Sequence, residues 1–166
     1  MRACMAEKVV KDFTVMIKYT AICIAAAALL LAPSCRDRNN MNTNVPYVPV
    51  NITINLGLPT YTYMETPGTF LMLEGGNRGV VLVHTLDDAF YAFDRTCTYQ
   101  PDQSCSKIEI DSSVYQFRCG TTMSGGFQKC CDSRFQTDGY PINGPASQPL
   151  KAYTVVRSGN IINITN

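Results

Sequence analysis

The stretch Val48-Pro49-Val50-Asn51-Ile52-Thr53-Ile54-Asn55-Leu56 alternates aliphatic residues with proline, asparagine and threonine along its whole length. In an extended chain, a period of two places every aliphatic side chain on the same face. We therefore expect a β-strand here, with one face against an apolar core and the other toward solvent.

The chain beyond this strand repeats the same kind of signal at short intervals. Further β-rich runs are Thr69–Leu73, Gly79–Val83, Phe90–Phe93, Lys107–Ile110, Val114–Cys119, Ala152–Val156 and Ile161–Ile164. Turn-forming triplets separate several of them. No amphipathic helical pattern lies between the runs, and only Leu86–Ala89 is expected to form a helical turn. The pattern predicts an all-β domain over residues 46–166, a small antiparallel β sandwich or barrel.

The N-terminal residues have the features of a signal peptide. Residues 21–31 (A-I-C-I-A-A-A-A-L-L-L) are apolar throughout, and three lysines precede them. A run of this length is too short to cross a bilayer core, which needs roughly 20 helical residues. Residues 1–34 are therefore interpreted as a signal peptide, and Met16 offers an alternative start.

Cys35 follows Ala32-Pro33-Ser34, where a bacterial lipobox has its lipid-modified cysteine. The segment resembles the looser lipoboxes of Bacteroides-type lipoproteins. This resemblance implies lipid attachment at Cys35, with the membrane as the first partner and the bacterial cell envelope as the location, in either a periplasmic or a surface-facing position. Residues 35–45 are polar and rich in asparagine, and are expected to form a flexible tether.

Charge and histidine content exclude several kinds of function. The leader holds four of the 14 basic and two of the 13 acidic residues, which leaves ten and eleven in the mature part. That balance provides no basic footprint for nucleic acid. His84 is the single histidine, which excludes any site with two histidine ligands, and it is expected at the surface or rim of the domain.

Five of the eight cysteines fall in the β domain: Cys97, Cys105, Cys119, Cys130 and Cys131. An oxidising envelope favours disulfides between them, with one thiol left over. If residues 111–113 turn a hairpin, equal offsets place Cys105 opposite Cys119, at a separation that a disulfide accepts.

Two segments of the domain resemble a known family. Residues 90–99 (F-Y-A-F-D-R-T-C-T-Y) resemble the first cluster-binding segment of Rieske iron–sulfur proteins, and the second segment is matched by S-R-F at 133–135, Gly139, G-P-A at 144–146, P-L at 149–150 and Tyr153. The similarity covers about residues 70–166 and implies a Rieske-like β architecture.

Rieske domains hold a [2Fe–2S] cluster with two cysteines on one iron and two histidines on the other. The resemblance places those four ligands at Cys97, Tyr99, Gln128 and Cys131, so that only Cys97 keeps its expected type. Residues 120–127 look like an inserted loop, and a second alignment makes Cys119 the displaced ligand. Phenol and carboxamide are poor substitutes for imidazole and thiolate, so we expect no cofactor and no metal at this site.

The resemblance also suggests what joins the two segments instead. A Cys97–Cys131 disulfide is one possibility and Cys97–Cys130 another. Many Rieske proteins have a loop-to-loop disulfide whose halves resemble Cys130 and the region of Cys105.

The expected function is therefore that of a membrane-anchored, non-catalytic lipoprotein that binds or assembles with an unidentified envelope protein. One alternative is [2Fe–2S] electron transfer with Cys97, Cys119, Cys130 and Cys131 as ligands. Another is thiol–disulfide redox chemistry at Cys130 and Cys131.

Overall fold

The computed structural model describes residues 44–166. The interpretations of residues 1–34 as a signal peptide and of Cys35 as a lipid site lie outside the described residues, as does all of the tether except its last two residues. The described part of the chain contains no helix that is long and apolar enough to cross a membrane.

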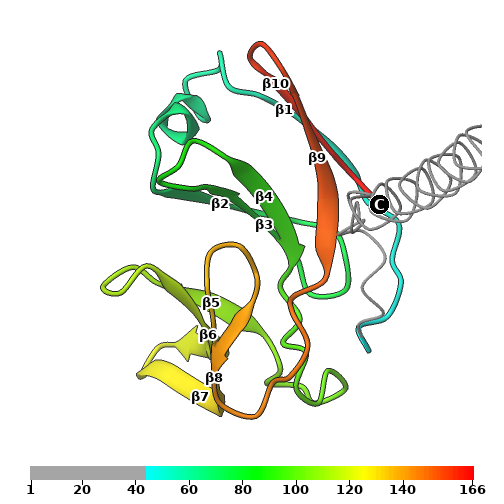
Figure 1. Cartoon of the computed structure of the whole chain (residues 1–166), viewed down its shortest axis with the longest axis vertical. Coiled ribbons are helices and arrows are strands. Elements are labelled where there is room, and N and C mark those ends of the chain that lie inside the picture. The colour runs from blue at the N-terminus through cyan, green and yellow to red at the C-terminus, as the bar shows by residue number, and fades with distance from the viewer. Residues whose placement is uncertain (1–43) are drawn as a thin grey trace, which may run out of the picture. The chain divides into compact units, whose positions relative to one another are not determined.

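A six-stranded antiparallel sheet forms the larger part of the domain, with strand order β1-β10-β9-β4-β3-β2 (Figure 1). Its strands are β1 (Asn51–Asn55), β2 (Thr69–Leu73), β3 (Val80–His84), β4 (Phe90–Asp94), β9 (Ala152–Ser158) and β10 (Ile161–Thr165). A short 3₁₀ helix, η2 (Thr62–Glu65), connects β1 to β2. Strand β9 pairs with β4 through only two residue pairs, at Ala92 and Phe93, where the sheet joins its two halves.

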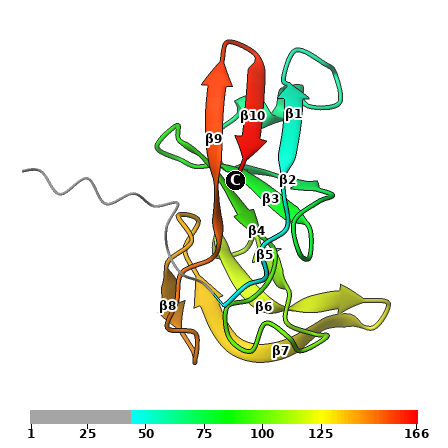
Figure 2. The same cartoon turned by 90° about the vertical axis from the view of Figure 1, so that its right-hand side faces the viewer.

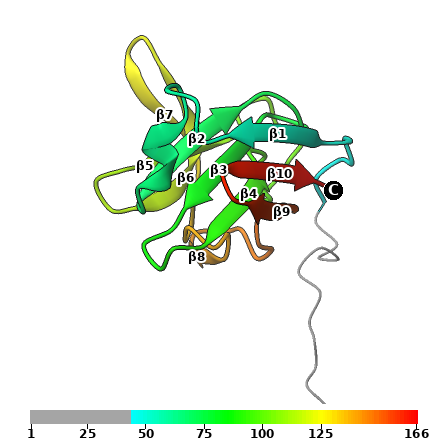
Figure 3. The same ribbon diagram turned by 90° about the horizontal axis from the view of Figure 1, so that it is seen from above.

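A second sheet of four antiparallel strands follows β4 in the chain and is ordered β5-β6-β7-β8. Its strands are β5 (Ile108–Asp111), β6 (Gln116–Met123), β7 (Gly126–Phe135) and β8 (Pro141–Asn143). The far part of the β6–β7 hairpin projects from the rest of the domain, which Figures 2 and 3 show from two directions.

The prediction of an all-β domain of antiparallel strands is confirmed. Strand β1 lies inside the alternating stretch that predicted it, and Ile54 on its inner face is buried. The expected helical turn at Leu86–Ala89 is wrong: these residues form a turn between β3 and β4, in which Asp88 has a positive φ of 63°. The expected loop at 120–127 is also wrong, because these residues form the tip of the β6–β7 hairpin.

Two apolar clusters form the core. One lies on the inner face of the six-stranded sheet and includes Leu56, Met64, Leu82 and Ile162. The other joins the two sheets through Phe93, Phe117 and Phe135, and extends to Cys97 and Cys119. All five residues of β3 are buried. The strand shows no alternation because its side chains contribute to both clusters.

Candidate functional site

A large bulge on β7 defines the site. Arg118 pairs with Arg134 and Gly120 pairs with Lys129, so the single residue Cys119 on β6 faces residues 130–133 on β7. The surplus residues must bend away from the ladder, since a bulge leaves extra residues without a partner. The bulge therefore brings Cys131 around toward Cys119.

Glycine is required on both sides of this bulge. Gly120 has φ 150°, and a Cβ there would lie 2.2 Å from the carbonyl oxygen of Gln128. Gly144 has φ 82°, and a Cβ there would lie 2.4 Å from the backbone of Asp132 and Ser133. The G-P-A segment thus packs directly against the bulge, which is a physical reason for its place in the sequence pattern.

The side chain of Cys97 approaches Cys119 and Cys131 from the loop after β4. The backbone N–H of Cys97 donates to the carbonyl of Ser106 at 3.1 Å, and the hydroxyl of Ser106 donates to the carbonyl of Cys97 at 3.2 Å. Thr98 anchors the next residue by donating its hydroxyl to the carbonyl of Gln148 at 2.7 Å. These bonds fix the backbone of Cys97, whose side chain is fully buried.

A buried carboxylate fixes the start of that loop. Asp94 accepts hydrogen bonds from the hydroxyl of Tyr153 at 2.7 Å and from the backbone N–H of Asn77 at 2.6 Å. It also accepts from the backbone N–H and the hydroxyl of Thr96, at 2.9 and 2.6 Å. Burial, and then the hydrogen bond to Asp94, raise the pKa of Tyr153 above its usual value, so Tyr153 remains a donor.

Three sulfur atoms meet where these elements converge. The Sγ atoms of Cys97, Cys119 and Cys131 all lie within 4.8 Å of one another. Those of Cys97 and Cys131 are 3.8 Å apart, and none of the three cysteines is disulfide-bonded. Cys97 and Cys119 are buried, whereas Cys131 is half-buried.

Cys97 and Cys119 have pKa values shifted in opposite directions. A hydrogen bond from Cys119 lowers the pKa of Cys97 to about 6, against the opposing effect of burial. The same hydrogen bond, together with burial, raises the pKa of Cys119 far above its usual value. A thiolate is therefore expected at Cys97 at neutral pH, with the proton retained on Cys119.

A cavity of about 200 Å³ gives access to two of the three cysteines. Its lining residues are Arg118, Cys119, Phe127, Lys129, Cys131, Asp132, Ser133 and Arg134. Arg118 stacks on the ring of Phe127 at 3.8 Å from the centroid, and Asp111 lies 3.6 Å from Arg118 and 3.3 Å from Arg134. Most of the charged residues that line the cavity are therefore cationic, and the carboxylate of Asp111 partly neutralises its two arginines.

The disulfide of the domain joins Cys105 to Cys130. This is the loop-to-loop pairing that the family resemblance implied, whereas the pairing of Cys105 with Cys119 is wrong. Asp111 pairs with Gln116, so the β5–β6 turn is four residues long, with Tyr115 at φ 52°, and Cys119 pairs with Ile108. The Cys97–Cys131 and Cys97–Cys130 disulfides are also absent from the described residues.

The structure separates the four positions that the family alignment assigned to ligands. Cys97 and Cys131 come together, as that alignment implied. Gln128 is exposed in the projecting hairpin, opposite Thr121, and Cys119 occupies the place beside the other two cysteines. Tyr99 is half-buried against the second core cluster. Cys130, a member of the four-cysteine alternative, is held in the disulfide.

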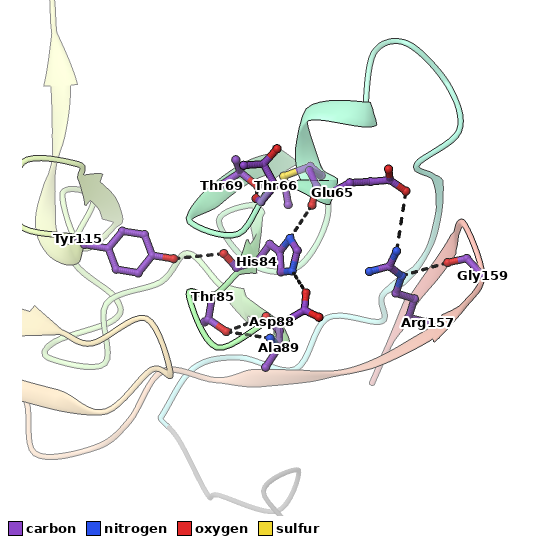
Figure 4. Close-up of polar contacts among 11 residues, drawn as sticks. Glu65, Thr66, Thr69, His84, Thr85, Asp88, Ala89, Tyr115, Arg157 and Gly159 are labelled. Carbon is purple, nitrogen blue, oxygen red and sulfur yellow. Dashed lines mark hydrogen bonds and ion pairs between the residues drawn. The ribbon is translucent and has the colours of Figure 1, made fainter.

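His84 lies elsewhere and is buried, so its expected position at the surface or rim is wrong. Nδ1 of its ring lies 2.8 Å from the carbonyl oxygen of Met64, and Nε2 lies 2.7 Å from the carboxylate of Asp88. Figure 4 shows the ring of His84 pointing toward Asp88. The ring stacks on Phe90 with 4.0 Å between centroids. A histidine whose two ring nitrogens both have hydrogen-bond partners can be buried at little cost. The sequence pattern did not reveal these two partners.

Comparisons with known proteins found likenesses in structure alone. No protein-family model and no curated protein matches the sequence. The structure is similar to the crystal structure of the plasma membrane Rieske protein PetC3 from Synechocystis PCC 6803, with 21% identity, a TM-score of 0.49, and coverage of 68% of this chain and 99% of that chain. It is also similar to the ferredoxin of carbazole 1,9a-dioxygenase from Nocardioides aromaticivorans IC177, with 20% identity, a TM-score of 0.43, and coverage of 71% and 97%.

The described residues form the antiparallel all-β architecture that the sequence predicts. The likeness concerns the fold, and what the site of this chain can hold follows from its own side chains. A Rieske cluster needs two imidazole ligands on its second iron. The single histidine is hydrogen-bonded to Met64 and Asp88. The side-chain atoms that could act as ligands at the site are the sulfurs of three cysteines. The residues present therefore do not fit a Rieske [2Fe–2S] cluster.

Proposed function

We propose that this protein is a lipid-anchored lipoprotein of the bacterial envelope, whose Rieske-like domain carries no iron–sulfur cluster and serves in binding rather than in catalysis or electron transfer. The observation that carries this proposal is the donor set, because three thiols converge where a Rieske cluster would need two cysteines and two histidines. The fourth nearby cysteine, Cys130, is not available as a ligand while it is bonded to Cys105.

The sequence supports the envelope part of the proposal. A leader ending before Cys35 places the acyl chains about ten residues ahead of the β domain, which is a short tether to the membrane surface. The Cys105–Cys130 disulfide agrees with an oxidising compartment. The partner that the proposal implies, besides the membrane, is another protein of the envelope.

The spacing of two cysteines favours a second candidate, thiol–disulfide chemistry. Cys97 and Cys131 are 3.8 Å apart at sulfur, Cys131 borders the cavity, and Cys97 has a lowered pKa. Oxidation would join these two sulfurs as a disulfide, with two electrons and two protons passing to an external disulfide that is reduced to a dithiol. Exchange with a dithiol that requires both residues would favour this candidate over binding.

The proposal is tested on the full chain purified in detergent under anaerobic conditions. We expect iron and acid-labile sulfide far below one atom per chain and no cluster absorption in the visible range, because the imidazole ligands are missing. In cells supplied with a palmitate analogue, we expect label on the wild-type chain and none on Cys35→Ala. Two irons and two sulfides per chain would contradict the cluster-free part, and label on Cys35→Ala would contradict the anchor.

A further inference from the structure

We propose that Cys97, Cys119 and Cys131 together bind a single thiophilic d¹⁰ metal ion, zinc(II) or copper(I). This inference rests on the proposed function, since a bound iron–sulfur cluster would occupy the same sulfurs. It adds a specific ligand to the proposed function, which states a binding role for the domain without saying what the domain binds.

The separation of the sulfurs suits one ion. Zinc–thiolate bonds of about 2.3 Å in a tetrahedral site place the sulfurs roughly 3.8 Å apart. The Sγ atoms of Cys97 and Cys131 are 3.8 Å apart, and the third sulfur lies within 4.8 Å of both. If the Sγ atom of Cys119 moved by less than one zinc–sulfur bond length, all three sulfurs would be at the separation that a single ion requires.

The three ligands come from elements that other contacts already hold in place. Cys97 lies in the loop fixed by Ser106, Cys119 lies on β6 in the core, and Cys131 lies on the bulge of β7. The neighbour of Cys131 in the chain, Cys130, is bonded to Cys105, which ties the bulge to the first loop. A site held in this way loses little conformational freedom when an ion binds.

The chemistry of the donors selects the class of ion. The converging group contains three sulfurs and no carboxylate or imidazole. Soft thiolates favour copper(I) and zinc(II) over magnesium or calcium, which prefer oxygen ligands. Zinc commonly takes four ligands, and the cavity beside Cys131 has room for a water as the fourth; copper(I) needs no fourth ligand.

The cavity also provides entry and charge compensation. Three thiolates and one such ion carry a net negative charge, and Arg118, Lys129 and Arg134 line the cavity beside them. The Nε atom of Arg118 is buried and has no hydrogen-bond partner among the described residues. The three cations outnumber the carboxylates of Asp111 and Asp132 that pair with them, and this excess lowers the cost of the thiolates.

Ser133 is positioned to orient Cys131. The backbone N–H of Ala146 donates to the Ser133 oxygen at 3.0 Å, and the Sγ atom of Cys131 lies 3.2 Å from the same oxygen. Without an ion, the thiol of Cys131 donates to Ser133. When the thiolate binds an ion, the hydroxyl hydrogen of Ser133 turns toward the sulfur, while Ala146 still donates to its oxygen. Ser133 is thus a positioning residue that supports either state.

The test uses the full chain in detergent, freed of metal by a chelator and kept anaerobic so that the three thiols stay reduced. Zinc(II) and copper(I) are titrated in separate arms, and native mass spectrometry counts the ions bound. We expect one ion per chain in at least one arm, with sulfur scatterers in the X-ray absorption spectrum of that ion. The arm with the higher affinity identifies the ion.

Variants locate the site. Cys131→Ser, at a half-buried position where folding is least at risk, is expected to weaken binding by more than about 100-fold. Ser133→Ala is expected to weaken binding roughly 10–100-fold, because Ser133 orients a ligand without contacting the ion. Gln128→Ala is the matched control on the same strand and is expected to bind as the wild type does, because its side chain is exposed in the hairpin. Circular dichroism verifies that each variant is folded.

Two results would overturn the inference: no ion bound in either arm, or undiminished binding by folded Cys131→Ser. If the protein contains neither iron nor sulfide and binds neither ion, the inference fails while the cluster-free proposal stands. If iron and sulfide are present in stoichiometric amounts, both fail.

Discussion

Replacement of Asp94 by alanine is expected to lower the free energy of unfolding by roughly 3–5 kcal/mol. The carboxylate is buried and accepts four hydrogen bonds, from Tyr153, from Asn77 and twice from Thr96. Alanine leaves those donors without an acceptor, and three of the four hydrogen bonds that are lost are buried. Urea unfolding of the two full-length proteins, followed by circular dichroism, measures the difference.

The matched control is Asp102→Ala, since Asp102 is exposed in the loop that follows Cys97. A surface substitution of this kind is expected to change stability by no more than about 0.5 kcal/mol. Asp94→Asn should lie between the two, because an amide oxygen still accepts but its NH₂ faces donors. A loss of less than 1 kcal/mol for Asp94→Ala would show that this network does not hold the β4 end of the site.

Removal of the disulfide by the double substitution Cys105→Ala and Cys130→Ala is expected to lower the free energy of unfolding by about 3 kcal/mol. The bond closes a loop over a sequence separation of 25, and a crosslink of that span restricts the unfolded chain by roughly this amount. The bond also ties the first loop to the bulge, so the variant should lose protection from hydrogen exchange near Cys131.

Reductant provides the control for this second prediction. Dithiothreitol should destabilise the wild type by a similar amount and leave the double variant unchanged. Equal stability of the wild type and the variant under oxidising conditions would indicate that Cys105 and Cys130 are not bonded in the protein.

Most of the strands, but not their register, could be predicted from the sequence, and β7 and β8 were not predicted. Alternation predicted β1 and short β-rich runs predicted β2 to β6, β9 and β10, because apolar periodicity is local. The register of β5 and β6 depends on the turn, and the four-residue turn ending near Tyr115 shifts Cys119 away from Cys105. The turn is one residue longer than expected and begins one residue later, so Cys119 pairs with Ile108 instead of Cys105.

The candidate site could be predicted only in part. The family pattern placed Cys97 and Cys131 near each other, and its second alignment included Cys119. The bulge at 130–133 could not be foreseen, because it packs closely against Gly144, and local periodicity carries no information about contacts between segments. The burial of His84 was missed for a similar reason, since its partner Met64 lies in η2.

The most direct test of the central claim is the state of the five domain cysteines in protein prepared anaerobically. The full chain is denatured with a chelator present and alkylated before and after reduction, and the peptides are mapped by mass spectrometry. We expect alkylation of Cys97, Cys119 and Cys131 without reductant, and of Cys105 and Cys130 only after reduction. If Cys97 and Cys131 react only after reduction, the site holds a disulfide, which would contradict a site of three free thiols.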